Sequence, residues 1–530
     1  MANPLVITNF GGPLTRKRTG DINSGLARFE TSWGYDPYSK PGNLTWLEQP
    51  TSILSWTGSQ GPMAVMKQRT EGDVNLVYGV AKSGNLYRIT VNSATNPNLD
   101  SPSVISALAG GFGNDRGAGM VFYGATEKIF VGDNTNIQRV NFDGSSPSVV
   151  GSVTSTGVPR PMITFLGKIY FGNGNNIGEV DSSELITTQA KLSPALPAGL
   201  FVRDLDVSTD GNYLQIITSR TNAAYPQGDS NDRTSSGAAD SFKFYWNGID
   251  SGATSFENYS GIVLSTNVVK ADQDFTFAHD PSGAAIFSGT EKILSLPRAL
   301  APHTNSAFLS GNILAFGTAE YESSSSRFRV GIFNYGQYDS ETPKGLFRLL
   351  RQNAQVEDDV TAVSACIGVS NRIYAPSIYG YANNISGTGK IYYSTQEEDL
   401  TTTSFDQRLW RFETVSNGVG SILAGVYETQ TQMFSKKVKV PEVRIYTEPL
   451  IGGNDFVVDL IGSGGSVMAG GSQRFQVATG SVTTGTDMVH FNPAMIPTYA
   501  LGVRITNSST TGVANWTANK IEVDYTDGGR

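Results

Sequence analysis

Histidine is the side chain that most often serves as a general base or metal ligand near neutral pH. The sequence contains three histidines, His279, His303 and His490, far apart along the chain. None of them stands in an HExxH spacing, which places two metal-binding histidines on one face of a helix. This pattern argues against a metal triad and against a Ser-His-Asp hydrolase.

Paired carboxylates are the second feature that would indicate catalysis. A glycosidase needs two of them about 5 to 10 Å apart. The chain has two acidic groups that would suit this chemistry: Asp204, Asp206, Asp210 and Asp272, Asp274. Ser208–Tyr213 resembles the Asp-box turn of sialidase-like propellers, in which an aspartate caps a hairpin by accepting hydrogen bonds from backbone amides. We therefore expect structural or solvated carboxylates here, and no catalytic residue.

Cofactor-binding patterns are incomplete. Cys366 is the single cysteine, so neither an internal disulfide nor a cysteine-based zinc site can form. Asp204-Leu205-Asp206 lacks the rest of a calcium loop. The glycines at 110–113 precede no GK[ST] sequence of a phosphate-binding loop. We expect a protein that is not an enzyme and holds no cofactor or metal.

Charge and hydropathy limit the partners. The formal net charge is −8, and the one basic cluster, Arg16-Lys17-Arg18, is typical of a solvated patch. No general basic face is available for specific nucleic-acid binding. Residues 1–10 lack the pattern of a signal peptide, and no run approaches the ~20 apolar residues of a membrane span. These features predict synthesis in a reducing cytoplasm without membrane insertion.

Residues 1–50 read as an extended N-terminal arm, because glycine and proline interrupt every period. Aromatic side chains carry large contact area at modest entropic cost and are enriched at interfaces. The arm has five that would anchor it to another protein: Phe29, Trp33, Tyr35, Tyr38 and Trp46. The alternative, that they pack on their own domain, stays open.

Residues 51–435 repeat one pattern, an apolar core ending near glycine and followed by a turn and a second strand. The clearest copies are residues 128–140 and 168–180, in which Lys-Ile-Phe-Val-Gly aligns with Lys-Ile-Tyr-Phe-Gly. Seven such cores begin at 76, 129, 169, 213, 285, 313 and 373. Their mean spacing is typical of four-stranded blades. We predict an all-β fold with a β-propeller of about seven blades.

Residues 436–530 have a different texture. In Lys520–Tyr525 apolar and charged residues alternate strictly, which indicates a strand with one wet face. We predict a C-terminal β-sandwich of about eight strands, jelly-roll-like, after the propeller.

The segments 9–14, 22–28 and 37–45 of the arm resemble the opening of uncharacterised virion proteins of tailed bacteriophages. A propeller followed by a sandwich is also similar in style to phage tail nozzle and tail-hub proteins. The resemblance implies a structural role in the virion tail, made in the bacterial host cytoplasm. It also implies a homo-oligomeric ring in contact with other virion proteins.

Two alternatives come from other classes of function. A carbohydrate- or receptor-binding virion protein would present exposed aromatics to a host surface glycan, with Trp56, Trp246 and Trp516 as candidates. A propeller glycosidase would use paired carboxylates such as Asp206 and Asp274.

Overall fold

The described part of the chain is built from strands, β1 to β39, and contains no helix. No helix in it is long and apolar enough to cross a membrane. The structure, a computed structural model, describes residues 3–8, 10, 29–33, 35–36, 43–46, 51–57, 60–71, 74–91, 102–109, 118–219, 241–253, 255–258, 267–272, 275–280, 283–288, 291–296, 305, 307–310, 313–322, 325–334, 348–352, 373–382, 389–399, 404–413, 425–451, 453, 455–477, 481–507 and 517–527.

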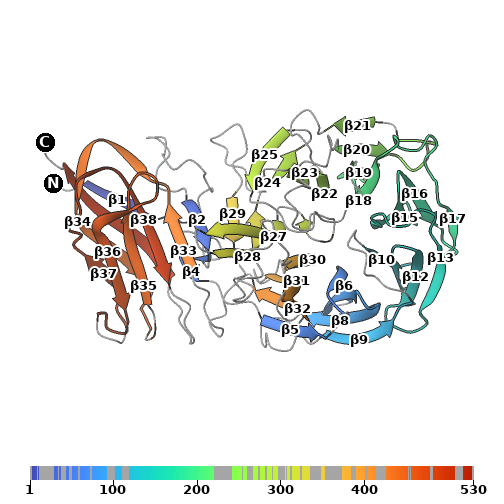
Figure 1. Cartoon of the computed structure of the whole chain (residues 1–530), viewed down its shortest axis with the longest axis horizontal. Helices are drawn as coiled ribbons and strands as arrows, with labels where there is room; N and C mark the ends of the chain where they lie inside the picture. Colours follow the sequence, from blue (N-terminus) through green and yellow to red (C-terminus); the bar gives the residue numbers. More distant parts are fainter. Residues whose placement is uncertain are drawn as a thin grey trace.

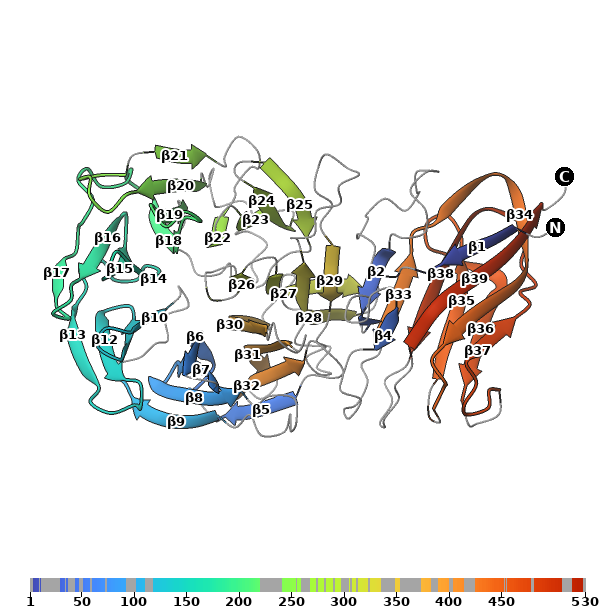
Figure 2. The same cartoon turned by 180° about the vertical axis from the view of Figure 1, so that it is seen from behind.

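Seven four-stranded antiparallel units make up the larger part of the described residues (Figures 1 and 2). Blade 1 comprises β6 (Met63–Glu71), β7 (Val74–Ala81), β8 (Asn85–Val91) and β9 (Pro102–Ala107). Blade 2 comprises β10 (Gly119–Tyr123), β11 (Lys128–Gly132), β12 (Asn136–Asn141) and β13 (Ser148–Ser152). Blade 3 comprises β14 (Met162–Phe165), β15 (Lys168–Asn173), β16 (Asn176–Val180) and β17 (Ile186–Thr188).

The remaining four units follow in chain order. Blade 4 comprises β18 (Phe201–Val207), β19 (Leu214–Ser219), β20 (Ser241–Trp246) and β21 (Ser255–Asn258). Blade 5 comprises β22 (Asn267–Asp272), β23 (Phe275–Asp280), β24 (Gly283–Ser288) and β25 (Glu291–Leu296). Blade 6 comprises β26 (Ala307–Ser310), β27 (Ile313–Glu322), β28 (Ser325–Asn334) and β29 (Arg348–Gln352). Blade 7 comprises β30 (Ile373–Ala382), β31 (Gly389–Asp399), β32 (Ser404–Glu413) and β5 (Thr51–Trp56).

The blades close into a ring. The first strand of each blade contacts the first strand of the next, in the order β6, β10, β14, β18, β22, β26 and β30, and β30 contacts β6 again. Each blade face is thereby covered by a neighbour, which removes the exposed sheet faces that a single small sheet would leave. The predicted all-β fold, a propeller followed by a C-terminal sandwich, is confirmed.

The ring is closed by a strand from the other end of the propeller sequence. β5 pairs antiparallel with β32, with Leu409 opposite Leu54 and Gln407 opposite Trp56. Beside this pairing, Trp56 Nε1 donates to Tyr87 Oη of blade 1 at 3.0 Å, and the Gly61 amide donates to Gln407 Oε1 at 2.9 Å. The N-terminal and C-terminal ends of the propeller are thus held in one blade.

The second unit is a two-layered sandwich. One layer runs β36–β35–β38–β33–β2 and the other β37–β34–β39–β1, with β4 and β3 continuing beyond β39. Its strands are β1 (Asn3–Ile7), β2 (Phe29–Trp33), β3 (Tyr35–Asp36), β4 (Leu44–Trp46), β33 (Gly425–Thr429), β34 (Gln432–Thr447), β35 (Asp455–Ile461), β36 (Val467–Gln476), β37 (Met488–Phe491), β38 (Thr498–Asn507) and β39 (Thr517–Asp527).

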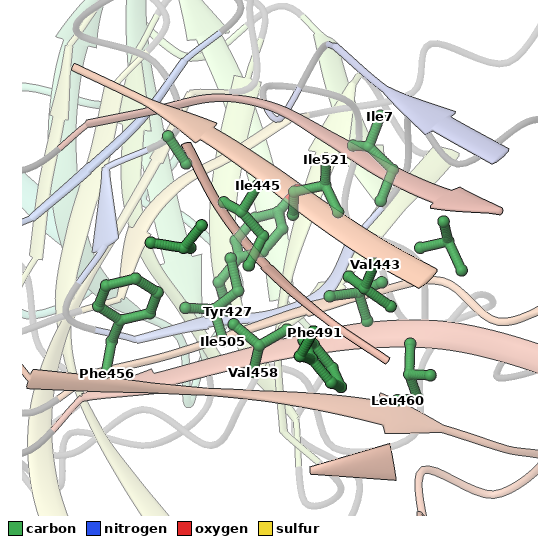
Figure 3. Close-up of a cluster of buried hydrophobic side chains, with 14 of the residues drawn as sticks. Ile7, Tyr427, Val443, Ile445, Phe456, Val458, Leu460, Phe491, Ile505 and Ile521 are labelled. Atoms are coloured by element: carbon green, nitrogen blue, oxygen red, sulfur yellow. The ribbon is translucent and has the colours of Figure 1, made fainter. Parts of the chain in front are cut away.

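The sandwich core is one apolar cluster that draws on both layers. Figure 3 shows Phe456, Val458 and Leu460 of β35 lying across from Val443 and Ile445 of β34. Ile521 and Val523 of β39 join them, and all of these side chains are buried. Burial of this kind is the main favourable contribution to folding.

The N-terminal segment differs from the expected extended arm over residues 1–50. Its described parts are sandwich strands: β1 pairs with β39, with Leu5 opposite Val523, and β2 pairs with β33. Within residues 436–530 the described part holds β35 to β39 and most of β34, fewer than the expected eight strands. β33 begins at Gly425, before the expected boundary at 436. The N-terminal strands β1 and β2 thus add to the two layers of the sandwich, by pairing with β39 and β33.

The recurring cores lie on comparable strands, with two exceptions that explain their uneven spacing. The first four and the sixth lie on the second strand of their blades, from β7 to β27. The core at 285 lies on β24, the third strand of blade 5, and the core at 373 lies on β30, the first strand of blade 7. Residues 223–239, which are rich in serine, aspartate, glycine and asparagine, lie between β19 and β20, outside the described residues.

The glycine that ends the repeated core has a packing reason. A Cβ on Gly132 would lie 2.5 Å from Arg160 Cγ, and one on Gly172 would lie 2.8 Å from Pro161 Cδ. The segment that enters blade 3 therefore passes directly over these two positions, and only glycine leaves enough room.

Candidate interaction surfaces

The five aromatic residues expected to anchor an arm fall in or near sandwich strands. Tyr35 has no exposed surface and belongs to the sandwich core, and its burial raises its pKa well above 10.0. This corrects its expected role as an exposed anchor, because the hydrophobic core takes the ring. Phe29 and Trp33 lie on β2 and Trp46 on β4, but their side chains lie outside the described part, as does all of Tyr38.

Two of the tryptophans considered for glycan binding are buried. Trp246 has no exposed surface, packs edge-on against Tyr170 at 5.3 Å, and donates from Nε1 to the Asp250 carbonyl at 2.7 Å. Trp56 is 5% exposed. Both rings pack between blades rather than facing solvent, and Trp516 lies outside the described residues.

Asp204 and Asp206 lie on β18, on one face of blade 4. Asp204 is buried on β18 and Asp206 is partly buried. Both point away from Leu205, which packs toward blade 3, so they face the side on which β22 of blade 5 packs. Asp272 ends β22, and Asp274 lies outside the described residues.

Asp210 caps its own turn. Its Oδ1 accepts from Ser208 Oγ at 2.6 Å and from the Asn212 amide at 3.0 Å, and these bonds lower its pKa. Ser208 Oγ in turn accepts from the Tyr213 amide at 3.0 Å. These hydrogen bonds hold the turn together, which is the structural role expected for this Asp-box-like segment.

The histidines remain separate in the described residues. His279 lies on β23 and His490 on β37, where Nδ1 is 3.2 Å from Glu442 Oε1, while His303 is outside the described part. Among the described side chains, no three of His, Cys, Asp or Glu gather as metal ligands.

The seam between blades 2 and 3 is held by a buried arginine. Arg160, with no exposed surface, donates to the Asp133 carbonyl at 3.2 Å and to the Gly172 carbonyl at 2.7 Å. It also donates to the Ser155 carbonyl and to Asn173 Oδ1 at 2.9 Å. Burial lowers its pKa to about 10, so it stays charged near neutral pH. One guanidinium thus joins two blades and the segment between them.

A second clamp crosses the same seam on the other face of the ring. Glu184, in the turn between β16 and β17, accepts from Lys128 Nζ of blade 2 at 2.7 Å and pairs with Arg139 of the same blade. Within blade 3, Glu179 pairs with Lys168 and Lys191, each at 2.7 Å. Arg139 and Glu179 occupy equivalent positions of the repeat but carry opposite charges. Arg139 of blade 2 therefore forms its ion pair across the seam, whereas Glu179 forms its ion pairs within blade 3.

Propeller and sandwich are joined through their sheets. β2 of the sandwich pairs on one side with β33 and on the other, in parallel, with β29 of blade 6, where Trp33 lies opposite Gln352. Blade 6 therefore belongs to the same extended sheet as the sandwich. The sequence carries no local signal for this link, because the link depends on backbone pairing between segments about three hundred positions apart.

One face of the propeller carries exposed apolar side chains. In a four-stranded meander the first and third turns lie at the same end, and blades 3 and 4 place there four large side chains, the turn patch: Leu166 (60% exposed), Leu185 (58%), Tyr213 (38%) and Ile249 (85%). Leu166 and the Ile249 turn are in direct contact, since a Cβ on Gly248 would lie 2.4 Å from Leu166 Cδ1. The sequence signal for this patch, Leu-Gly in a two-residue turn, is weak.

The outer face of the sandwich is charged and self-compensated. Arg444 on β34 pairs with Glu522 at 3.1 Å, Asp524 at 2.9 Å and Glu442 at 2.6 Å. Tyr446 Oη donates to Glu522 Oε2 at 3.0 Å. These contacts follow the register in which Arg444 lies opposite Glu522 on β39.

Comparisons with known proteins give no family for this chain and only distant structural similarity. No protein-family description matches the chain, and no curated protein matches its sequence. Solved structures with similar architecture include a glycoside hydrolase (8% identity, 88% of this chain and 99% of the other, TM-score 0.30) and the Dos1 propeller (10%, 72% and 92%, 0.35). A subtype N10 neuraminidase-like protein matches over 68% of this chain and 97% of its own length, at 13% identity and TM-score 0.30. Such distant similarity carries no argument about activity, and the propeller assignment rests on strand order and register.

Proposed function

We propose that this chain is a structural protein of a tailed-bacteriophage virion, located in the tail, where it makes protein–protein contacts in a symmetric assembly. The observation that supports the proposal most is the double closure of the molecule. Strands from residues 1–56 complete both blade 7 and the sandwich, and one sheet runs from blade 6 into the sandwich. Strand pairing of this kind resists separation of the propeller from the sandwich, which suits a load-bearing assembly.

The use of the polar side chains also supports a structural role. Arg160 and Glu184 are buried and bind across the seam between blades 2 and 3, and Asp210 caps a turn. Groups with these partners stabilise a rigid disc that presents turns on both faces. The resemblance of residues 9–14, 22–28 and 37–45 to phage virion proteins gives the assembly its proposed setting.

The test is to ask whether the chain belongs to a particle. Particles from a lysate of the producing host are purified on a density gradient, and the chain is quantified by mass spectrometry and located with gold-labelled antibody by electron microscopy. We expect a fixed copy number for each particle and label on the tail. A chain that stays in the soluble fraction would overturn the proposal. Hydrolysis of a polysaccharide by the purified chain would favour the glycosidase alternative instead.

A further inference from the structure

Leu166 breaks two local rules at once. It has φ +47° in the two-residue turn Leu166–Gly167, which connects Phe165 and Lys168. Asparagine, aspartate and glycine are the residues that such hairpin turns favour, because positive φ is costly for other side chains. Leu166 is also 60% exposed, so its side chain gains little from burial in the monomer. A residue that is unfavourable both for its backbone and for its solvation indicates a role outside the folding of this chain.

The surroundings of Leu166 are apolar with an acidic rim. Three turns of the patch each combine an exposed apolar residue with a carboxylate: Leu185 with Asp181, Tyr213 with Asp210, and Ile249 with Asp250. The nearby cation Lys168 is already paired with Glu179 at 2.7 Å. A partner for this surface therefore needs exposed apolar side chains together with lysine or arginine.

The sandwich of the same chain has a surface of that kind. Ile496 is 66% exposed and Tyr499 is 50% exposed, and Lys437 Nζ lies 5.7 Å from the centre of the Tyr499 ring. Lys436 and Lys439 are also exposed on β34. These five residues, the sandwich patch, combine apolar area with three positive charges.

The two patches lie too far apart to meet within one molecule. Val438, between the lysines, is opposite Asp527 near the C-terminus and opposite Thr498 of β38. Both termini lie at the end of the sandwich away from the propeller, whereas blades 3 and 4 lie at the far side of the ring (Figures 1 and 2). Contact between the patches thus needs two molecules.

We propose that the turn patch of one molecule docks on the sandwich patch of a second copy, in a head-to-tail contact. A heterologous contact of this type forms a ring when the rotation closes and a filament when it does not. The inference deepens the proposed function, and rests on it, by naming a second copy as one partner in the assembly.

The test is self-association of the full chain, measured by sedimentation velocity over a range of concentrations. The turn variant is Leu166→Asn with Ile249→Ser, the sandwich variant is Lys437→Glu with Tyr499→Ser, and the control is Val149→Ser, which removes a 49% exposed side chain outside both patches. We expect each patch variant to weaken association at least ~10-fold, as the loss of central apolar contacts does elsewhere, and the control to leave it unchanged.

Mixing distinguishes the geometry. The turn variant keeps an intact sandwich patch and the sandwich variant keeps an intact turn patch, so a 1:1 mixture should form a heterodimer that does not grow. Failure of the mixture to associate, or loss of association in one variant only, would overturn the head-to-tail contact.

Two further measurements keep the outcome clear. Leu166→Asn should keep or raise the thermal midpoint, because asparagine suits positive φ, so that lost association cannot be ascribed to unfolding. A wild-type chain that is monomeric at every concentration overturns this inference, yet leaves the proposed function standing if the chain is present in particles. If the chain self-associates but is absent from particles, the proposed function is overturned while the head-to-tail contact stands.

Discussion

Charged side chains with several partners lie both in the seam between blades 2 and 3 and on the outer face of the sandwich, at very different exposure. In the seam, Arg160 has no exposed surface and the Glu184 side chain is 8% exposed. On the sandwich, the side chains of Arg444 and Glu442 are 25% and 31% exposed. Removing a partner is costly where the remaining group stays buried and minor where water can replace it.

The difference follows from how each architecture covers its sheets. A propeller blade has a neighbour on both faces, so a charge on a blade face lies in a seam and needs a matched partner. A sandwich sheet has one wet face, so its charges collect there. The burial of two strands shows this directly: all five residues of β16 are buried, whereas β39 alternates between buried and partly exposed positions from Ile521 to Asp524.

The change expected to have the largest effect is Arg160→Met. It leaves the carbonyls of Asp133, Ser155 and Gly172 without this donor in a buried place. Because each buried acceptor left unsatisfied costs about 1–3 kcal/mol, we expect a loss of about 3–5 kcal/mol in the stability of the propeller. Urea unfolding with hydrogen exchange resolved by peptide would show the loss in blades 2 and 3. Arg160→Lys, which keeps the charge but not the planar fork, should recover only part of it; a loss below about 1 kcal/mol for Met would contradict the seam argument.

Ile521→Ala tests the apolar counterpart in the sandwich. The side chain is buried in the core between the layers. Its truncation should cost about 3 kcal/mol through lost burial and a cavity. Faster exchange confined to the strands of the sandwich would fit two separately packed cores, whereas equal acceleration in blades 2 and 3 would show that the units unfold together.

Glu184→Gln should have an intermediate effect, on the order of 1–3 kcal/mol, because a buried charged hydrogen bond is lost. Burial by itself disfavours the charged form of Glu184, but its contacts with Lys128, Thr126 and Arg139 outweigh burial and lower its pKa below 4.5. The clamp therefore contributes fully above about pH 4.5 and weakens as pH falls through the lower folded value.

The measurement for this clamp is the thermal midpoint against pH between pH 3 and 7. The wild-type midpoint should fall on the acid side more steeply than that of Glu184→Gln, and the two curves should approach each other at low pH. Parallel curves across the range would mean that Glu184 does not couple protonation to stability.

The smallest effect is expected for Arg444→Met on the outer face of the sandwich. Its ion pairs are partly exposed, so the change should cost less than about 1 kcal/mol and should diminish further in high salt. Thermal unfolding at low and high ionic strength gives the comparison. A loss as large as that of Arg160→Met would end the distinction between the two charged regions.

Local patterns predicted the blades well where a repeat was intact. Residues 128–140 and 168–180 form β11–β12 and β15–β16 as the alignment indicates. In blade 5 the core at 285 lies on the third strand, not on the second as in most other blades. Both strands are short and apolar, and nothing in their composition reveals their order within a blade.

The candidate site was harder to predict. Tyr35 is of a residue type that is common at interfaces, but it is buried in the core. Cores and interfaces favour the same aromatic rings, so the residue type alone does not tell the two environments apart. Leu166 carries no signal in the sequence, because its exposure and its positive φ become apparent only in the folded turn.

Local sequence patterns are enough to predict that this chain is all-β, that its middle is a propeller and that the strand near its C-terminus has one wet face. Those properties are local, since side-chain alternation and turn residues record which face of each strand is buried. Three long-range pairings become visible only in the folded molecule: β5 closes blade 7, β1 lies on β39, and β2 joins the propeller to the sandwich. Ladder hydrogen bonds are made by backbone groups that every residue shares, so the choice of a distant partner depends on how the whole molecule packs.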